Sequence, residues 1–148
     1  LRWANVTDTG LTRSLNEDSL CVSPEIGLFA VADGMGGHRA GEVASQMALQ
    51  FLEQELAKRL RDGEKPDDAL IGSIKEANRH VYELAVRNPN LIGMGTTVTA
   101  CLKLQNEVLV GQVGDSRAYL LRGETIERLT EDHSLVQEKR RHYRGTGF

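Results

Sequence analysis

The sequence predicts an α+β fold in which antiparallel strands pack with two long helices. Two apolar segments, 19–22 and 28–33, are separated by a Pro-Glu-Ile-Gly turn, a spacing typical of an antiparallel hairpin. Residues 40–61 and 66–87 carry apolar side chains at helical spacing. Further alternating segments follow residue 95 at hairpin loop lengths, so antiparallel sheets are favoured over parallel βαβ units.

Turn chemistry and alternation set the limits of the elements. Residues 3–9 are expected to form a strand that ends in a turn at Gly10. Asp62 and Gly63 should end the first helix, and Pro66 suits the first turn of the second. The later strands are expected at 98–104, 108–115, 116–121 and 125–129, followed by a helix start at Thr130.

Both helices are expected to supply core residues and no chemistry. The stripe of the first helix consists of Val43, Met47, Phe51, Leu52, Leu56 and Leu60. The stripe of the second consists of Leu70, Ile74, Ala77, Val81, Leu84 and Ala85.

Length and composition indicate one globular domain, or part of one. The 148 residues are 40% hydrophobic and 26% charged, which is ordinary for a soluble chain. A net charge of -3 gives no footprint of a nucleic-acid partner, and the basic run at 139–144 is interpreted as a solvated segment. No apolar run approaches the roughly 20 residues of a membrane span.

The cysteines and the first residues bear on the compartment. Cys21 and Cys101 are far apart in apolar strands, so they are interpreted as buried free thiols in a reducing cytoplasm. No His/Cys cluster has the ligand spacing of a zinc site. The chain begins without a signal-peptide pattern and without an initiator Met, so residues before Leu1 are expected to have been trimmed or left out.

Asp33 is the residue around which the chemistry is expected to be organised. It ends the apolar segment 28–33 and is followed by a glycine-rich turn and then by a helix. Glu17 and Asp18 stand directly before the other strand of the predicted hairpin. Because a hairpin places the start of one strand beside the end of the next, both carboxylates should approach Asp33.

Acidic residues at strand ends indicate a site for hard cations. Asp115 ends a later strand, as Asp33 ends an earlier one. Carboxylates without His or Cys suit Mg²⁺ or Mn²⁺, and the unobstructed carbonyl of Gly34 is a further candidate ligand. Two such ions bridged by one carboxylate activate water and hold a phosphoryl group. Arg13 could then contact the phosphate with its planar guanidinium.

Each of these residues also has a simpler interpretation. A lone Asp before Gly, such as Asp33, is more often a turn residue than a ligand. Arg13 alone would be a surface charge, and His38 and His133 are interpreted as structural. The glycines after Asp33 superficially suggest a dinucleotide-binding turn, but Arg39 stands where the third glycine belongs. The convergence of several acids favours the metal site.

The chain resembles a known family in five segments that occur in the family's order. These segments are RSLNEDS, VADGMGGHRAGEVAS, GTT, VGDSRAYLLR and LTEDHSLV. Together they are similar to the metal-dependent protein phosphatases of type 2C, the PPM family, in the form typical of bacteria. The resemblance covers residues 10–137 and implies an α-β-β-α sandwich, two antiparallel sheets flanked by helices.

The resemblance also implies an activity and roles for the site residues. It implies hydrolysis of phosphoserine and phosphothreonine in proteins by a water that bridges two, or with a weaker position three, Mn²⁺ or Mg²⁺ ions. Asp33 would bridge the metals, and the Gly34 carbonyl and Glu17 would bind them. Asp18 would lie in the near shell and Asp115 at the weaker position. Arg13 would contact the phosphate of the substrate.

Other features of the family set limits on this expectation. Met35 stands where many animal relatives carry His after Asp-Gly, so no general acid is carried over. Residues 1–148 are expected to be the N-terminal portion of a single phosphatase domain whose later strands and aspartates are missing, with a flap-like or irregular tail from about 138. A cognate kinase is a candidate partner. The alternative is a catalytically inactive fragment of this fold that binds phosphate or a partner.

Overall fold

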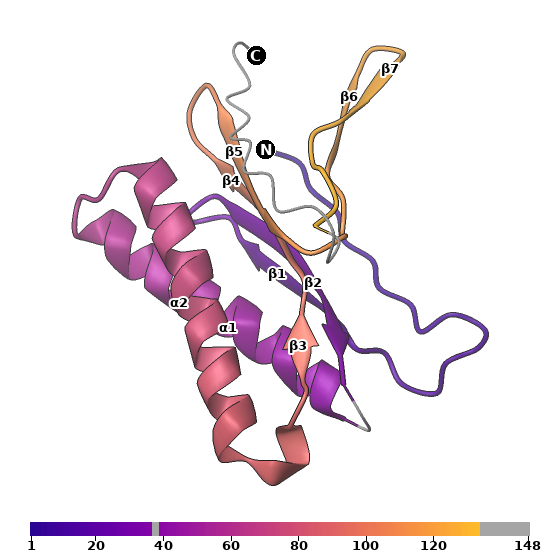
Figure 1. The fold of residues 1–148 in the computed structure, drawn as a ribbon. Helices are drawn as coiled ribbons and strands as arrows, with labels where there is room; N and C mark the ends of the chain where they lie inside the picture. The colour runs from indigo at the N-terminus through magenta and orange to yellow at the C-terminus, as the bar shows by residue number, and fades with distance from the viewer. Residues whose placement is uncertain (37–38, 134–148) are drawn as a thin grey trace.

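The computed structural model describes residues 1–36 and 39–133 (Figure 1). These residues contain two α-helices, one short 3-10 helix and seven strands. The elements are β1 (Asp18–Ser23), β2 (Leu28–Met35), α1 (Ala40–Arg61), α2 (Pro66–Arg87), η1 (Pro89–Leu91), β3 (Gly95–Thr96), β4 (Val98–Lys103), β5 (Val108–Val113), β6 (Tyr119–Arg122) and β7 (Thr125–Arg128). The bounds of both long helices agree with those predicted from the sequence.

The strands form one antiparallel sheet and one separate hairpin. The larger sheet has the order β1-β2-β4-β5, and β3 extends it by pairing with the end of β2. Strands β6 and β7 pair only with each other. The α+β class is therefore confirmed. Within the described part of the chain, β6 and β7 are the strands that lie outside the large sheet. A hairpin in place of a complete second sheet is what a partial sandwich is expected to have.

The β1–β2 hairpin depends on a glycine at its turn. Gly27 has φ +76°, a conformation that side chains with a Cβ rarely adopt. Its carbonyl oxygen accepts a 2.8 Å hydrogen bond from the backbone N–H of Lys103, and an added Cβ would collide with the Lys103 carbonyl. The turn is thereby joined to the end of β4, which keeps β2 in the middle of the sheet.

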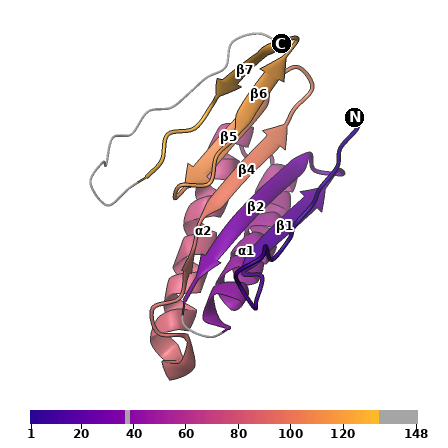
Figure 2. The same ribbon diagram turned by 90° about the vertical axis from the view of Figure 1, so that its right-hand side faces the viewer.

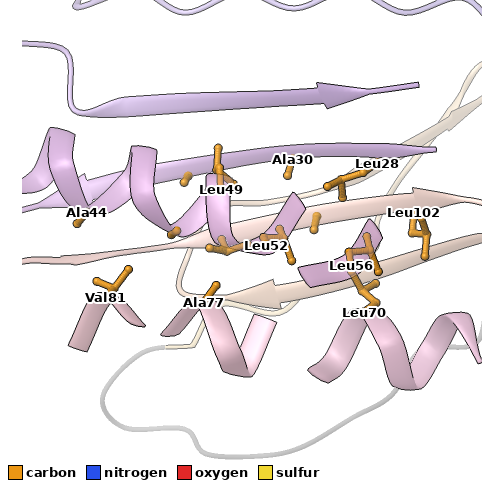
Figure 3. Packing of buried hydrophobic residues seen from close by; sticks show 14 of the residues in the cluster. Leu28, Ala30, Ala44, Leu49, Leu52, Leu56, Leu70, Ala77, Val81 and Leu102 are labelled. Atoms are coloured by element: carbon orange, nitrogen blue, oxygen red, sulfur yellow. The ribbon is translucent and has the colours of Figure 1, made fainter. Parts of the chain in front are cut away.

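Both helices cover the same face of the large sheet (Figure 2). The core between the helices and the sheet contains Leu28, Leu52, Leu56 and Leu102, each fully buried, together with many alanines (Figure 3). Burying one leucine side chain contributes about 1.5–3 kcal/mol, so this cluster supplies much of the stability. The alanines let α1 approach β2 closely.

The buried face of α1 differs from the predicted stripe. Leu52 and Leu56 are in the core as predicted, but the remaining buried positions are small residues and one leucine: Ala40, Gly41, Ala44, Ser45, Ala48 and Leu49. Val43, Phe51 and Leu60 pack only at the margin. The stripe was drawn through the larger side chains, whereas close packing against the strands selects the smaller ones.

Two predicted elements are wrong in the described residues. Residues 3–9 form no strand, and Val6 is 85% exposed. A strand needs a hydrogen-bonding partner, and among residues 1–36 and 39–133 none pairs with this segment. Residues 130–133 are not helical, and the Thr130 hydroxyl accepts a 3.0 Å hydrogen bond from the backbone N–H of Ala118 and not from the described residues of the turn that would follow it. The continuation of that helix and the tail from about 138 lie outside the described residues.

The strand limits near Asp115 also need correction. Strand β5 ends at Val113, and β6 begins only at Tyr119. Gly114 has φ +102°, which turns the chain out of the strand before Asp115. Among the described residues, no helix is both long and apolar enough to cross a membrane.

Candidate metal centre

Asp18 and Asp33 are directly opposed in the antiparallel pair of β1 and β2. The next residue along β2, Gly34, donates its backbone N–H to the carbonyl oxygen of Glu17 at 3.1 Å. The predicted approach of these residues is therefore confirmed. The cause is the hairpin register, which a tight turn fixes and which places the start of β1 beside the end of β2.

The electrostatics of Asp33 show which charges surround it. Although Asp33 is exposed, its pKa is raised above the ordinary value, first by partial desolvation of its carboxyl group and then by the negative charges of Asp18, Asp115 and Glu17. The positive charge of Arg13 acts in the opposite direction. The four other charged residues singled out in the sequence thus all influence this one carboxylate. Their sum around Asp33 is negative, which is an environment that a cation would relieve.

Glu17 is held between the end of β2 and the first turn of α1. Its carbonyl oxygen accepts a second hydrogen bond, of 2.6 Å, from the hydroxyl of the fully buried Ser45. Its carboxylate lies against Gly41, where an added Cβ would overlap Glu17 Oε1. A Cβ on Gly34 would overlap the Gly41 carbonyl oxygen. Two glycines therefore let strand, helix and carboxylate meet.

Arg13 lies at the rim of this centre. Its Nη1 is 3.5 Å from Oε2 of Glu17, and the side chain is 71% exposed whereas that of Glu17 is 14% exposed. A separation of 3.5 Å is long for a hydrogen-bonded ion pair, and ion pairs with an exposed partner contribute little to stability. Arg13 is therefore close to the acidic cluster, and its exposed guanidinium is accessible to an anion in solvent.

The backbone of Asp33 is fixed by the two threonines that precede β4. Its N–H donates to Oγ1 of Thr97 at 2.9 Å, and its carbonyl oxygen accepts from the Thr97 N–H at 2.9 Å. The hydroxyl of Thr96 donates to the same carbonyl oxygen at 3.0 Å. Sequence reasoning assigned no role to these residues. The available signal was the pair of hydroxyls standing directly before an apolar strand.

Asp115 sits in a turn that is held by its neighbours. The side-chain amide of Gln112 donates to the carbonyl oxygens of Gly114 and Ser116, at 3.0 and 2.7 Å. The backbone of His133 donates to the Gly114 carbonyl oxygen at 2.9 Å, and its Nδ1 accepts from the Gly114 N–H at 3.3 Å. The structural role predicted for His133 is confirmed. Sequence reasoning missed Gln112 and Ser116.

A groove of about 300 Å³ runs along the sheet beside these carboxylates. Asp18, Asp33 and Ser116 line it, together with residues 6–8 of the N-terminal segment. The donor set is oxygen only, which fits Mg²⁺ or Mn²⁺ in chemistry. The number of donors is too small for a complete site, because within residues 1–36 and 39–133 no three acidic, His or Cys side chains are grouped to hold an ion. The acids are near enough to repel one another but too far apart for a closed ligand cage.

Known proteins match this chain over most of its length. The family model described as "Protein phosphatase 2C" matches residues 4–142. The chain is 42% identical over 137 residues to a serine/threonine phosphatase Stp of Listeria innocua, covering 89% of this chain and 54% of the relative. It is 41% identical over 140 residues to the phosphatase PstP of Mycobacterium tuberculosis, covering 93% of this chain and 26% of the relative.

Solved structures agree with these relatives. The crystal structure of Mycobacterium tuberculosis PstP superposes with a TM-score of 0.73 at 40% identity, covering 87% of this chain and 53% of that chain. A structure of the PstP catalytic domain, described as a complex with two manganese ions, has a TM-score of 0.73 at 39% identity and covers 87% and 54%. The chain thus spans about half the length of the solved phosphatases it matches.

Proposed function

Because the chain belongs to the protein phosphatase 2C family, we propose that the complete protein containing it is a metal-dependent serine/threonine phosphatase. The observation that carries this proposal is the position of Asp33 near the end of β2, which continues past the predicted limit to Met35; Asp33 is opposed to Asp18 and within the electrostatic reach of Glu17 and Asp115. The relatives named as serine/threonine phosphatases support the reaction class, and the manganese complex of PstP supports the type of cofactor.

The proposed ligands share oxygen donors on the end of β2 and the elements beside it. Asp33 would hold metal through its carboxylate, and the Gly34 carbonyl and the Glu17 carboxylate would supply further oxygen ligands beside it. Asp18 would orient the near shell, and Asp115 would serve a third, weaker position. When bound, Mn²⁺ or Mg²⁺ supplies an activated water and neutralises charge on the phosphoryl group.

Arg13 is proposed to hold the phosphate of the substrate. Its exposed guanidinium can leave Glu17 and present a planar pair of N–H donors, which matches two phosphate oxygens. The net reaction breaks the bond between phosphorus and the serine or threonine oxygen, and water supplies the new oxygen on phosphorus. The thioether of Met35 has no proton to give, so the general acid is not assigned to it.

The proposed substrates are proteins phosphorylated on serine or threonine, with a cognate kinase as a regulatory partner and the cytoplasm as the compartment. The half-buried thiols fit that compartment, because Cys21 and Cys101 are free. A second candidate is a fragment that binds phosphate or a partner without catalysis. The incomplete ligand cage among the described residues favours this second reading for the 148-residue chain alone.

A hydrolysis assay separates the two candidates. The complete protein is incubated with a phosphothreonine peptide, with Mn²⁺ or with a chelator, as wild type and as Asp33→Ala. The proposal predicts metal-dependent phosphate release that Asp33→Ala abolishes. Glu107→Ala is the matched control, because this exposed carboxylate lies in the turn after β4, at the opposite end of the sheet. Hydrolysis by the wild type that is insensitive to chelation would refute the proposal, whereas phosphate binding without hydrolysis would favour the second candidate.

A further inference from the structure

We propose that Thr97 is a positioning residue that fixes the Asp33 backbone relative to the Asp115 turn. The inference rests on the metal roles proposed above for Asp33 and Asp115. Thr97 lies between β3 and β4 and is only 7% exposed. Its separation from Asp33 along the chain is large, so the contact exists only in the folded sheet.

The first half of the link is the double contact between Thr97 and Asp33. Oγ1 of Thr97 accepts from the Asp33 N–H, and the Thr97 N–H donates to the Asp33 carbonyl oxygen, both at 2.9 Å. Both backbone polar groups of Asp33 are therefore bound to one residue. Two hydrogen bonds from one partner restrict rotation of the Asp33 peptide groups and so fix the direction in which its carboxylate leaves the strand.

The second half is a hydroxyl contact to the residue after Asp115. Oγ1 of Thr97 lies 2.8 Å from Oγ of Ser116. A hydroxyl oxygen has two lone pairs and one proton, so Thr97 can accept from Asp33 and still bond to Ser116. The Ser116 carbonyl oxygen is held independently by the Thr99 hydroxyl at 3.1 Å and by the Gln112 amide at 2.7 Å. The Asp115 turn is therefore rigid where Thr97 touches it.

The methyl group of Thr97 supplies a third restraint. A Cβ added to Gly114 would lie 2.6 Å from Cγ2 of Thr97, so this methyl occupies the space beside the glycine. One branch of the side chain thus binds Asp33 and Ser116, and the other packs on Gly114. A shift of Asp33 or of the Asp115 turn would therefore displace Thr97, which adds a side-chain restraint to the strand pairing that already relates them.

Substitutions that separate hydroxyl from shape test the proposal in the complete protein. Thr97→Val keeps the branched shape and removes the hydroxyl, and Thr97→Ser does the reverse. We expect Thr97→Val to lower the calorimetric Mn²⁺ affinity about tenfold to a hundredfold, the range seen when groups that orient ligands are removed. Thr97→Ser should restore most of that affinity. Ser73→Ala removes another fully buried hydroxyl, on α2, and should leave Mn²⁺ affinity unchanged.

A second variant keeps the test decisive if Thr97→Val does not fold. Ser116→Ala removes only the hydroxyl contact and leaves the Asp33 bonds intact, so a severalfold lower Mn²⁺ affinity is expected. Wild-type affinity in Ser116→Ala, or in folded Thr97→Val, would overturn the proposal. Asp33→Ala distinguishes the two claims. If Asp33→Ala abolishes Mn²⁺ binding while the Thr97 and Ser116 variants bind normally, only this inference fails. If Asp33→Ala binds normally, the proposed function fails.

Discussion

Asp18 and Asp33 occupy directly opposed positions across two adjacent antiparallel strands. Like charges at such positions destabilise a sheet, because the side chains of opposed residues lie close together. This pair lies where β1 begins, beside a groove, and Asp115 and Glu17 add further negative charge. The repulsion among these carboxylates destabilises the folded state when no cation is present, and it favours the binding of a cation.

Asp33→Asn should therefore stabilise the metal-free protein. The raised pKa of Asp33 means that its ionised form is disfavoured in the folded state, so stability is lost as pH rises through that pKa. The amide removes this loss at neutral pH, and we expect a higher Tm than wild type in the presence of a chelator. With Mn²⁺ added, the Tm of the wild type should rise and that of Asp33→Asn should not. A lower Tm for the metal-free variant would contradict the repulsion argued above.

Arg13→Ala should weaken capture of phosphate and leave metal binding intact. Loss of a charge-assisted, two-pronged contact costs on the order of 1.5–3 kcal/mol, about tenfold to a hundredfold in affinity. The measurement is inhibition of the complete protein by inorganic phosphate. Arg13→Lys should rescue poorly because an ammonium has no planar fork. Unchanged inhibition in Arg13→Ala would make this residue a surface charge only.

Gly34→Ala should destabilise the fold and disturb Glu17. The new Cβ would overlap the backbone carbonyl of Gly41, which cannot move without shifting the start of α1. Overpacking of this kind costs about 1–3 kcal/mol, measurable by chemical denaturation. Gly72→Ala is the contrasting control. Gly72 lies in the interior of α2, and its new Cβ would meet only the guanidinium of Arg59, a side-chain end that can shift while it keeps its partly exposed partners Glu55 and Glu64. That variant should be neutral or more stable by up to about 1 kcal/mol, and equal effects of both changes would refute the argument.

Cys21 should make stability depend on pH in the alkaline range. Burial and then the negative charges of Glu53 and Glu25 raise the pKa of this thiol from 9.0 to about 11. Between these values the unfolded thiol loses its proton and the folded thiol keeps it, so stability falls as pH rises. The free energy of unfolding of the wild type should decline from pH 9 to 11 more steeply than that of Cys21→Ser. Parallel curves for the two proteins would show that the thiol is not perturbed.

Local signals predicted the parts of the fold that local chemistry determines. Helices α1 and α2 begin and end where predicted, because proline, glycine and asparagine mark their limits. The approach of Asp18 to Asp33 follows from one short hairpin. Residues 3–9 alternate like a strand, but alternation cannot supply the partner that a strand requires.

The hydrogen bonds that hold the candidate metal-binding residues in place could not be predicted in the same way. Thr97 meets Asp33 across a large stretch of sequence, and it meets Ser116 only because β4 and β5 pair in a particular register. Ser45 reaches the Glu17 carbonyl from a buried position on α1. Such contacts depend on tertiary packing, and a hydroxyl in the sequence does not identify its partner. The metal roles of Glu17, Asp18, Asp33, Gly34 and Asp115 remain predictions.

The central claim is that the carboxylate of Asp33 holds divalent metal in the complete protein. Calorimetric titration with Mn²⁺ of the wild type and of Asp33→Ala tests it most directly, with Glu107→Ala as the control. Wild type and control should bind with the same affinity, and Asp33→Ala should show no binding isotherm at the same concentrations. Binding by Asp33→Ala with wild-type affinity would contradict the account, because the acidic cluster would then hold metal without the residue at its centre.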